Sequence, residues 1–238
     1  MGQKISLDME GGGKMSAYLS LPESGHGPGL MVLQEIYGVN FHIKGVTDYF
    51  ANLGYVALAP NVYWRLDPNG GDDSINIYDK AGGEKAVATY YRYDEESGIK
   101  DLGVVANHLR AMPACSGKVG AVGYCFGGRL AFLHGVRNGV DAAASLYPTF
   151  IERCLDLADR ATFPWSLHLP EHDSMETPQA QPNIIKAFGH RKNVELFRYP
   201  GSHHAFDSDH ARTNVYDRWA AQLANSRIAI FFDRKLRQ

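Results

Sequence analysis

The sequence predicts an α/β domain with a mostly parallel central sheet and helices on both of its faces. Short, nearly continuous apolar runs such as Leu30–Leu33 and Ala142–Leu146 alternate with segments of helical periodicity. Apolar runs without polar alternation are typical of parallel strands that are buried on both faces. No repeat and no Ser/Gly/Pro-rich linker interrupts the 238 residues, so we expect a single domain over residues 1–238.

The strands are predicted where short apolar runs lie between turn residues. In chain order the buried strands are Leu30–Leu33, Tyr55–Ala59, Val119–Gly123, Ala142–Leu146, Trp165–Leu169 and Val194–Tyr199. Two further segments near the N-terminus, Ile5–Leu7 and Met15–Leu19, are expected to form an antiparallel pair at one edge of the sheet.

The helices are predicted where apolar residues recur every three or four positions. The first carries Ile43, Val46, Phe50 and Leu53, and Gly54 ends it in a left-handed cap. The second ends before Pro113, and its apolar face is made of Ile99, Leu102, Val105 and Leu109. A third helix covers Phe126–Arg137, and a last one runs from about Asp209 to Arg234 with Tyr216, Trp219, Leu223 and Ile230 on one side.

The segment Asn61–Tyr93 differs from the rest of the chain because it is long and rich in Tyr, Asp and Gly. It contains Tyr63, Trp64, Arg65 and Tyr78. Long insertions over a sheet often serve as lids or pocket walls. A lid and a solvated surface excursion are therefore both open interpretations for residues 61–93.

Composition excludes several classes of partner. The net charge of −2, without a basic run, gives no electrostatic reason to expect nucleic acid or an anionic membrane as a partner. The start of the chain lacks the pattern of a secretory signal, and no apolar stretch approaches the roughly 20 residues that span a bilayer. We expect a cytoplasmic protein, a monomer or small homo-oligomer, whose three cysteines Cys115, Cys125 and Cys154 are free thiols.

The strongest local motif is Gly123-Tyr124-Cys125-Phe126-Gly127-Gly128, between an apolar strand and a helix. It matches the G-x-S-x-G nucleophile elbow of α/β-hydrolases, with cysteine in place of serine. The elbow forces a strained backbone at the nucleophile, so glycines flank Cys125. A helix N-terminus favours a thiolate, and the N–H of Phe126 is expected to face a developing oxyanion.

A thiol nucleophile needs a base, and the base needs a group that orients it. In α/β-hydrolases these follow the nucleophile in the order acid, then histidine, each after a strand. Asp173 follows the strand Trp165–Leu169, with Glu171 as a rival two residues earlier. His204 follows Val194–Tyr199, and we expect its neighbour His203 to point elsewhere.

A further carboxylate, Glu35, comes directly after the buried strand Leu30–Leu33. It is expected at the same sheet edge as Cys125, although a solvated loop glutamate is an open alternative. The N–H of Ile36 is a candidate second oxyanion donor because the loop after this strand commonly supplies one.

Together these segments resemble the dienelactone hydrolase family. The matching segments are Gln34–Asn40, Ala59–Arg65, Gly123–Gly128, Asp173 and Tyr199–Phe206. The resemblance implies an α/β-hydrolase with a Cys-His-Asp triad and neither metal nor cofactor. It matches the family's histidine to His204, and its glutamate, which helps to deprotonate the resting thiol, to Glu35. The family reaction is hydrolysis of an enol-lactone that carries a carboxylate.

The sequence departs from the family pattern where arginines clamp that carboxylate. The region before the mid-chain helix reads Lys80–Lys85 without arginine, and after His204 the next arginine is Arg212. Arg65, Lys85 or Arg92 are the candidate substitutes, but lysine does not reproduce a bidentate fork. The substrate-binding residues that we expect are Tyr63, Arg65, Lys85 and Tyr90.

The sequence therefore predicts a carboxylic ester hydrolase that opens enol-lactones or activated esters through a thioester on Cys125. A promiscuous carboxylesterase or phosphotriesterase on the same residues is one alternative. A catalytically silent protein that binds a small ligand is another. A metallohydrolase that uses His203, His204, Asp207, Asp209 and His210 is the alternative from a different enzyme class.

Overall fold

The computed structural model describes residues 2–67, 75, 77–209 and 215–238, and the chain divides into two compact units, Met1–Ala121 and Val122–Gln238. In chain order the first unit contains β1 (Gln3–Asp8), β2 (Lys14–Ser20), β3 (Gly27–Leu33), α1 (Phe41–Asn52), β4 (Val56–Pro60), α2 (Lys80–Arg92) and α3 (Glu95–Ala111). Strand β5 (Cys115–Tyr124) crosses the boundary. The second unit contains α4 (Phe126–Asn138), β6 (Ala142–Leu146), the 3₁₀ helix η1 (Ile151–Arg160), β7 (Trp165–His172), α5 (Ala180–Phe188), β8 (Val194–His203) and α6 (Arg218–Leu236).

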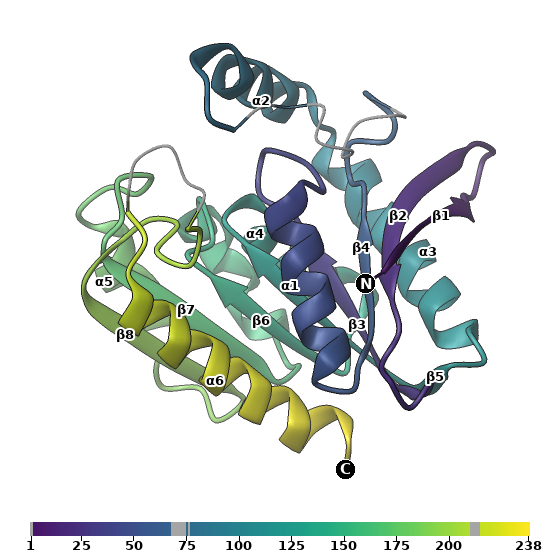
Figure 1. The fold of residues 1–238 in the computed structure, drawn as a ribbon. Coiled ribbons are helices and arrows are strands. Elements are labelled where there is room, and N and C mark those ends of the chain that lie inside the picture. Colours follow the sequence, from purple (N-terminus) through teal and green to yellow (C-terminus); the bar gives the residue numbers. More distant parts are fainter. Residues whose placement is uncertain (1, 68–74, 76, 210–214) are drawn as a thin grey trace. The chain divides into compact units, whose positions relative to one another are not determined.

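The strands of the first unit pair in the order β1, β2, β4, β3. β1 and β2 are antiparallel with Gln3 opposite Leu19, β2 and β4 are antiparallel, and β3 and β4 are parallel. The predicted N-terminal antiparallel pair is therefore confirmed. Helix α1 packs on β3 and β4 from one side and α3 from the other, as Figure 1 shows.

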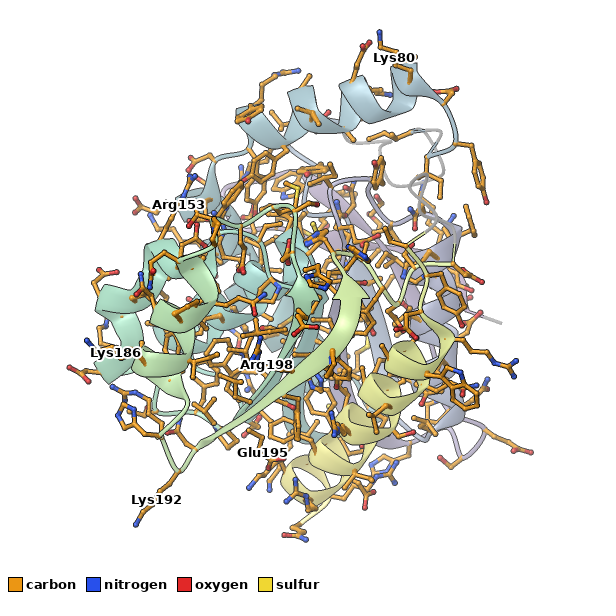
Figure 2. All side chains as sticks on the ribbon, turned by 90° about the vertical axis from the view of Figure 1, so that its left-hand side faces the viewer. Lys80, Arg153, Lys186, Lys192, Glu195 and Arg198 are labelled. Carbon is orange, nitrogen blue, oxygen red and sulfur yellow. The ribbon has the colours of Figure 1, made fainter. Side chains whose placement is uncertain are left out.

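The second unit contains a parallel set of strands, with β6 beside β7 and β7 beside β8. Figure 2 shows β8, on which Glu195 and Arg198 are labelled, with α6 on one side and α5 and η1 on the other. Trp165 is fully buried and contacts the rings of Phe132 and Phe188, with centroids at 4.6 and 5.0 Å. The predicted mostly parallel α/β architecture with helices on both faces is confirmed.

The last helix differs from the prediction at its start and in its buried face. It begins at Arg218 because Asp217 caps it, accepting hydrogen bonds from the N–H groups of Trp219 and Ala220 at 3.0 and 3.1 Å. The predicted apolar face is wrong, since Trp219 is 78% exposed and Ile230 is 60% exposed. The face that packs inward is instead made of Ala220, Ala221, Ala224, Ile228, Phe231, Phe232 and Leu236. Small alanines let this helix approach the strands closely, and a pattern based on large residues misses such a face.

The segment 61–93 contains helix α2, which the sequence did not predict. Asp79 caps this helix by accepting the N–H of Gly82 at 2.6 Å, and only Gly82 and Ala86 are buried in it. Residues 68–74 and 76 of the segment lie outside the described residues. The interpretation of residues 61–93 as a lid stays a prediction. No helix in the described ranges combines the length and apolar character that crossing a bilayer requires.

Candidate active site

Cys125 occupies a strained turn between β5 and α4. Its φ is +53° and its ψ −116°, a conformation that a residue with a side chain rarely adopts. Three hydrogen bonds hold the turn: the Cys125 N–H donates to the Leu146 carbonyl at 3.0 Å, and the Cys125 carbonyl accepts from the N–H groups of Gly128 and Thr149, both at 3.1 Å. Strain maintained by surrounding bonds is a frequent property of reactive residues.

The glycines of the motif have steric reasons that the structure makes explicit. A Cβ on Gly123 would lie 1.9 Å from the carbonyl oxygen of Gly127, a contact that no rotamer change relieves because both groups are backbone. A Cβ on Gly128 would lie 3.0 to 3.1 Å from Pro148 and Leu146. The close strand–helix turn therefore requires glycine at position 123.

The first turn of α4 is also bound to the core of the second unit. The hydroxyl of Ser145 on β6 donates to the Gly128 carbonyl at 2.7 Å, and Trp165 Nε1–H donates to the same hydroxyl at 3.0 Å. All three groups are buried. The backbone that presents Cys125 is thus fixed by a chain of hydrogen bonds from β7 through β6.

Asp173 and His204 form a hydrogen-bonded pair at the ends of β7 and β8. Nδ1 of His204 lies 2.9 Å from both carboxylate oxygens of Asp173. The Asp173 side chain is 2% exposed, and its Oδ1 also accepts the N–H of Met175 at 2.9 Å. This arrangement fixes the orientation of the imidazole and makes Nδ1 the donor, so that Nε2 is the atom left to exchange a proton.

The Nε2 atom of His204 is buried and has no hydrogen-bond partner among the described residues. Burial lowers the pKa of His204, but the charge of Cys125 and the hydrogen bond to Asp173 raise it, and the net pKa lies well above 6.5. A raised pKa means that the imidazolium is favoured. The surroundings therefore favour the protonated imidazole of His204, and Cys125 is one of the groups that stabilise it.

His203 and Glu171, the alternative candidates for the histidine and the acid, interact with other residues. The imidazole of His203 lies against that of His172, with ring centroids at 5.4 Å. The carboxylate of Glu171 accepts the N–H of Gly201 at 2.8 Å and lies 3.7 Å from His172. The ring of His203 thus packs against His172, and Asp173 rather than Glu171 orients His204.

Four non-glycine residues in the described ranges have positive φ, and all four lie in the second unit: Cys125, Tyr147, Phe150 and Ala205. Tyr147 directly follows β6, and its ring contacts that of His204 with centroids at 5.2 Å. Sequence analysis missed Tyr147 as a neighbour of the histidine. Its position directly after a predicted strand was the available signal, because side chains there gather at the same sheet edge.

Sequence analysis also missed Glu176, a half-buried residue three positions after Asp173. Its charge neighbours include Asp173 and Glu152. The signal that was available is the placement of an acidic residue in the loop that carries Asp173.

Glu35 and Ile36 belong to the first unit. Glu35 follows β3 by two residues and is 6% exposed, so it is not the solvated loop residue of the alternative interpretation. Gln34 beside it is fully buried, and its Nε2 donates to the Glu35 carbonyl at 3.4 Å. Buried polar groups need hydrogen-bond partners, so the loop after β3 is shaped around these two side chains.

The four predicted substrate-binding residues also lie in the first unit. Arg65 is held by Asp101, to which its Nη2 and Nε donate at 2.7 and 2.9 Å, and Asp101 also accepts Trp64 Nε1–H at 2.9 Å. Lys85 is half-exposed and lies 4.0 Å from Asp67. The remaining two are Tyr63, buried against the ring of Tyr93, and Tyr90, which contacts Tyr91.

The metal-dependent alternative gains no support from the described residues. No group of three or more His, Cys, Asp or Glu side chains there could hold a metal ion. Asp207 is buried and accepts the side-chain amide of Asn225 at 2.8 Å. His210, one of the proposed ligands, and Arg212, the next arginine after His204, lie outside the described residues.

The fold is that of the α/β-hydrolases. The crystal structure of a putative dienelactone hydrolase from Klebsiella pneumoniae has a TM-score of 0.84 with 23% identity, and 98% of each chain is covered. A dienelactone hydrolase-like promiscuous phosphotriesterase from metagenomic libraries has a TM-score of 0.78 with 20% identity, covering 99% of this chain and 98% of the other.

The sequence comparisons identify the family within this class. The sequence pattern of the dienelactone hydrolase family matches residues 15–236. Carboxymethylenebutenolidase 1 of Cupriavidus pinatubonensis is 30% identical over 94% of this chain and 93% of its own, and a carboxymethylenebutenolidase of a Pseudomonas species is 32% identical over 84% and 82%. The chain belongs to the dienelactone hydrolase family and is a hydrolase that acts on ester bonds.

Proposed function

We propose that this hydrolase opens enol-lactones or activated esters through a thioester on Cys125, with His204 as the proton carrier and Asp173 as the group that orients it. The observation that carries the proposal is the hydrogen bond between Asp173 and His204. The Nε2 atom of His204 has no hydrogen-bond partner among the described residues, and the charge of Cys125 raises the pKa of His204. The strained φ of Cys125 at the start of α4 supports it, because the helix N-terminus stabilises a thiolate.

The first step is acyl transfer to sulfur. The Cys125 thiolate attacks the carbonyl carbon, and the negative charge moves to the carbonyl oxygen. The N–H groups of Phe126 and Ile36 are the proposed donors to this oxyanion. Collapse of the tetrahedral intermediate forms the thioester and breaks the C–O bond, and the leaving enolate or alkoxide takes the proton of the His204 imidazolium.

The second step regenerates the thiol. Neutral His204 accepts a proton from water while the water oxygen attacks the thioester carbon. The C–S bond then breaks, and the carboxylic acid product leaves. Asp173 stabilises the imidazolium in both steps and keeps the imidazole in the tautomer whose Nε2 exchanges the proton.

The role of Glu35 rests on the family resemblance alone. The corresponding glutamate of the family interacts with the resting thiol and helps to deprotonate it when substrate binds. The burial of Glu35 is compatible with such a role, because it keeps the carboxylate out of bulk solvent.

The substrate class follows from the sulfur nucleophile. A thiolate is itself easily expelled from a tetrahedral intermediate, so the other leaving group must be at least as good. Enol esters, lactones and activated aryl esters satisfy this condition better than amides. Arg65 is already bound to Asp101 by two hydrogen bonds, so it is a poor candidate for a free clamp on a substrate carboxylate.

The decisive test replaces Cys125 by alanine and uses Cys154→Ala as the matched control. The two cysteines are equally buried, at 8% exposure each, but Cys154 lies in η1 rather than at the elbow. Hydrolysis of p-nitrophenyl acetate and of an enol-lactone should fall to the background in Cys125→Ala and remain within about twofold of wild type in Cys154→Ala. Retention of more than about 5% of the activity by Cys125→Ala excludes the proposed nucleophile.

Mass spectrometry of the wild type during turnover should show an acyl adduct on Cys125. An adduct that forms stoichiometrically and never turns over would instead indicate a ligand-binding protein. A panel of esters with and without a second carboxylate, assayed on the wild type, measures whether a substrate charge is recognised, and Arg65→Ala should leave the preference unchanged because Arg65 is bound to Asp101.

A further inference from the structure

A second acidic side chain, Glu176, lies beside the Asp173–His204 pair. It sits on the loop after β7, three residues beyond Asp173, and its backbone N–H donates to the Asp173 carbonyl at 3.4 Å. The N–H of Met175 donates to the carboxylate of Asp173 at 2.9 Å. The loop therefore turns back on Asp173, and the Glu176 carboxyl lies close enough to Asp173 and His204 for their charges to act on it.

The carboxyl of Glu176 is shielded from water and unsatisfied. Both of its oxygens are buried, and neither has a hydrogen-bond partner in the part of the chain that the structure describes. Leaving an ionised carboxylate without hydrogen bonds costs several kcal/mol, and a neutral carboxyl avoids most of this cost.

The charged groups around Glu176 favour the neutral form further. Asp173 and Glu152 of η1 both repel a carboxylate, and Oε2 of Glu152 is also buried without a partner. Arg153 contacts Glu152 at 3.9 Å and is largely exposed. His204 and the amide of Gln181 on α5 favour the ionised form and lower the pKa of Glu176. Burial first, then Asp173 and Glu152, raise the pKa of Glu176 to about 8.

Resting on the proposed function, we infer that Glu176 is a positioning residue that stays neutral beside Asp173 and His204 in neutral solution and adds a second negative charge in alkaline solution. While it is protonated, Asp173 is the main anion that acts on His204. Once it is ionised, the added charge stabilises the imidazolium, so that His204 keeps its proton to a higher pH. The residue thereby extends the alkaline range over which the imidazolium can protonate a leaving group.

The experiment compares the pH profiles of kcat/KM for wild type, Glu176→Gln and Glu171→Gln. Glutamine has the shape of the protonated glutamate but cannot ionise. Glu171→Gln is the matched control because it removes the same charge near the end of β7, from a side chain that is bound to the N–H of Gly201 instead.

At pH 6 we expect Glu176→Gln to retain kcat/KM within about twofold of wild type, since the native residue is then neutral. The alkaline limb of its profile should move to lower pH by about half a unit or more, the size expected for removal of a nearby charge. The limb of Glu171→Gln should stay where it is in the wild type.

The inference is overturned if the alkaline limb of Glu176→Gln does not shift, or if that of Glu171→Gln shifts equally. A loss of kcat/KM in Glu176→Gln that is the same at every pH also overturns it, because a purely structural role produces that result. A stability measurement, which does not depend on catalysis, distinguishes failure of this inference from failure of the proposed function. Urea unfolding at pH 6 and pH 9 reports the protonation of Glu176 even if Cys125 is not the nucleophile. Because the unfolded chain ionises Glu176 from about pH 4.5 and the folded state does so only near pH 8, the stability gained by Glu176→Gln should be larger at pH 9 than at pH 6. An identical difference at both values also refutes the inference.

Discussion

Replacing Gly123 by alanine tests whether the close turn at the elbow positions the nucleophile. The added Cβ would lie 1.9 Å from the Gly127 oxygen, 2.2 Å from its carbonyl carbon and 2.7 Å from the Gly128 nitrogen, whereas ordinary contact begins near 3.4 Å. The first turn of α4 would have to move by more than about 1 Å, against its bonds to Ser145 and Thr149. Overpacking a core costs about 1–3 kcal/mol, and because only backbone can yield here we expect about 3 kcal/mol or more.

The measurement combines urea unfolding with the initial rate of activated-ester hydrolysis. Gly45→Ala is the control, because Gly45 lies in the exposed part of α1 with nothing within 4 Å of its added Cβ, and it should stabilise the protein by about 0.5–1 kcal/mol. Gly123→Ala should also lose at least about tenfold in rate, since a 1 Å displacement of a reacting group is costly. Unfolding and kinetics that match the wild type would show that the turn does not hold Cys125 in place.

Two further predictions concern buried polar groups. Burial, and then the charge of Arg227, lower the pKa of His168 to about 3. The unfolded chain binds this proton below about pH 6.5 whereas the folded state does not, so the free energy of unfolding falls as the pH drops below 6.5. By pH 4 the loss is about 3 kcal/mol. His168→Gln should remove this loss in urea titrations at pH 7 and pH 4, and a stability difference from wild type that does not change with pH contradicts it. Asp101→Asn should destabilise the protein by about 1–3 kcal/mol in the same assay, because Asp101 accepts from both Trp64 and Arg65. Its rate of Cys125 alkylation should stay at the wild-type value, and a stability loss below about 0.5 kcal/mol would show that this network matters little.

The strands and the elbow could be predicted because local sequence determines them. A parallel strand that is buried on both faces needs a continuous apolar run, and Gly123 is required by a contact within five residues of itself. The order of Cys125, Asp173 and His204 along the chain was enough to predict the Asp173–His204 pair, which the structure shows at 2.9 Å. The catalytic roles stay predictions.

Features that depend on contacts between residues far apart in the chain could not be predicted from local sequence. Three alanines share the buried face of α6 with larger apolar residues, and the position of that face depends on how closely the helix approaches the strands. Arg65 was predicted as a substrate ligand, but its partner Asp101 is 36 residues away and no local pattern indicates the pairing. The neighbours of Glu176 come from η1, α5, the loop after β8 and its own loop, so its raised pKa is a property of the fold.

The three tryptophans of the chain occupy three different environments, which has a practical consequence for spectroscopy. Trp64 is buried in the first unit with its indole N–H on Asp101, Trp165 is enclosed by aromatic rings in the second, and Trp219 faces solvent. Trp219→Phe removes the exposed fluorophore and leaves one buried emitter in each unit. The intrinsic fluorescence of that variant can then follow the opening of each half of the molecule separately, through quenching at Trp64 or at Trp165.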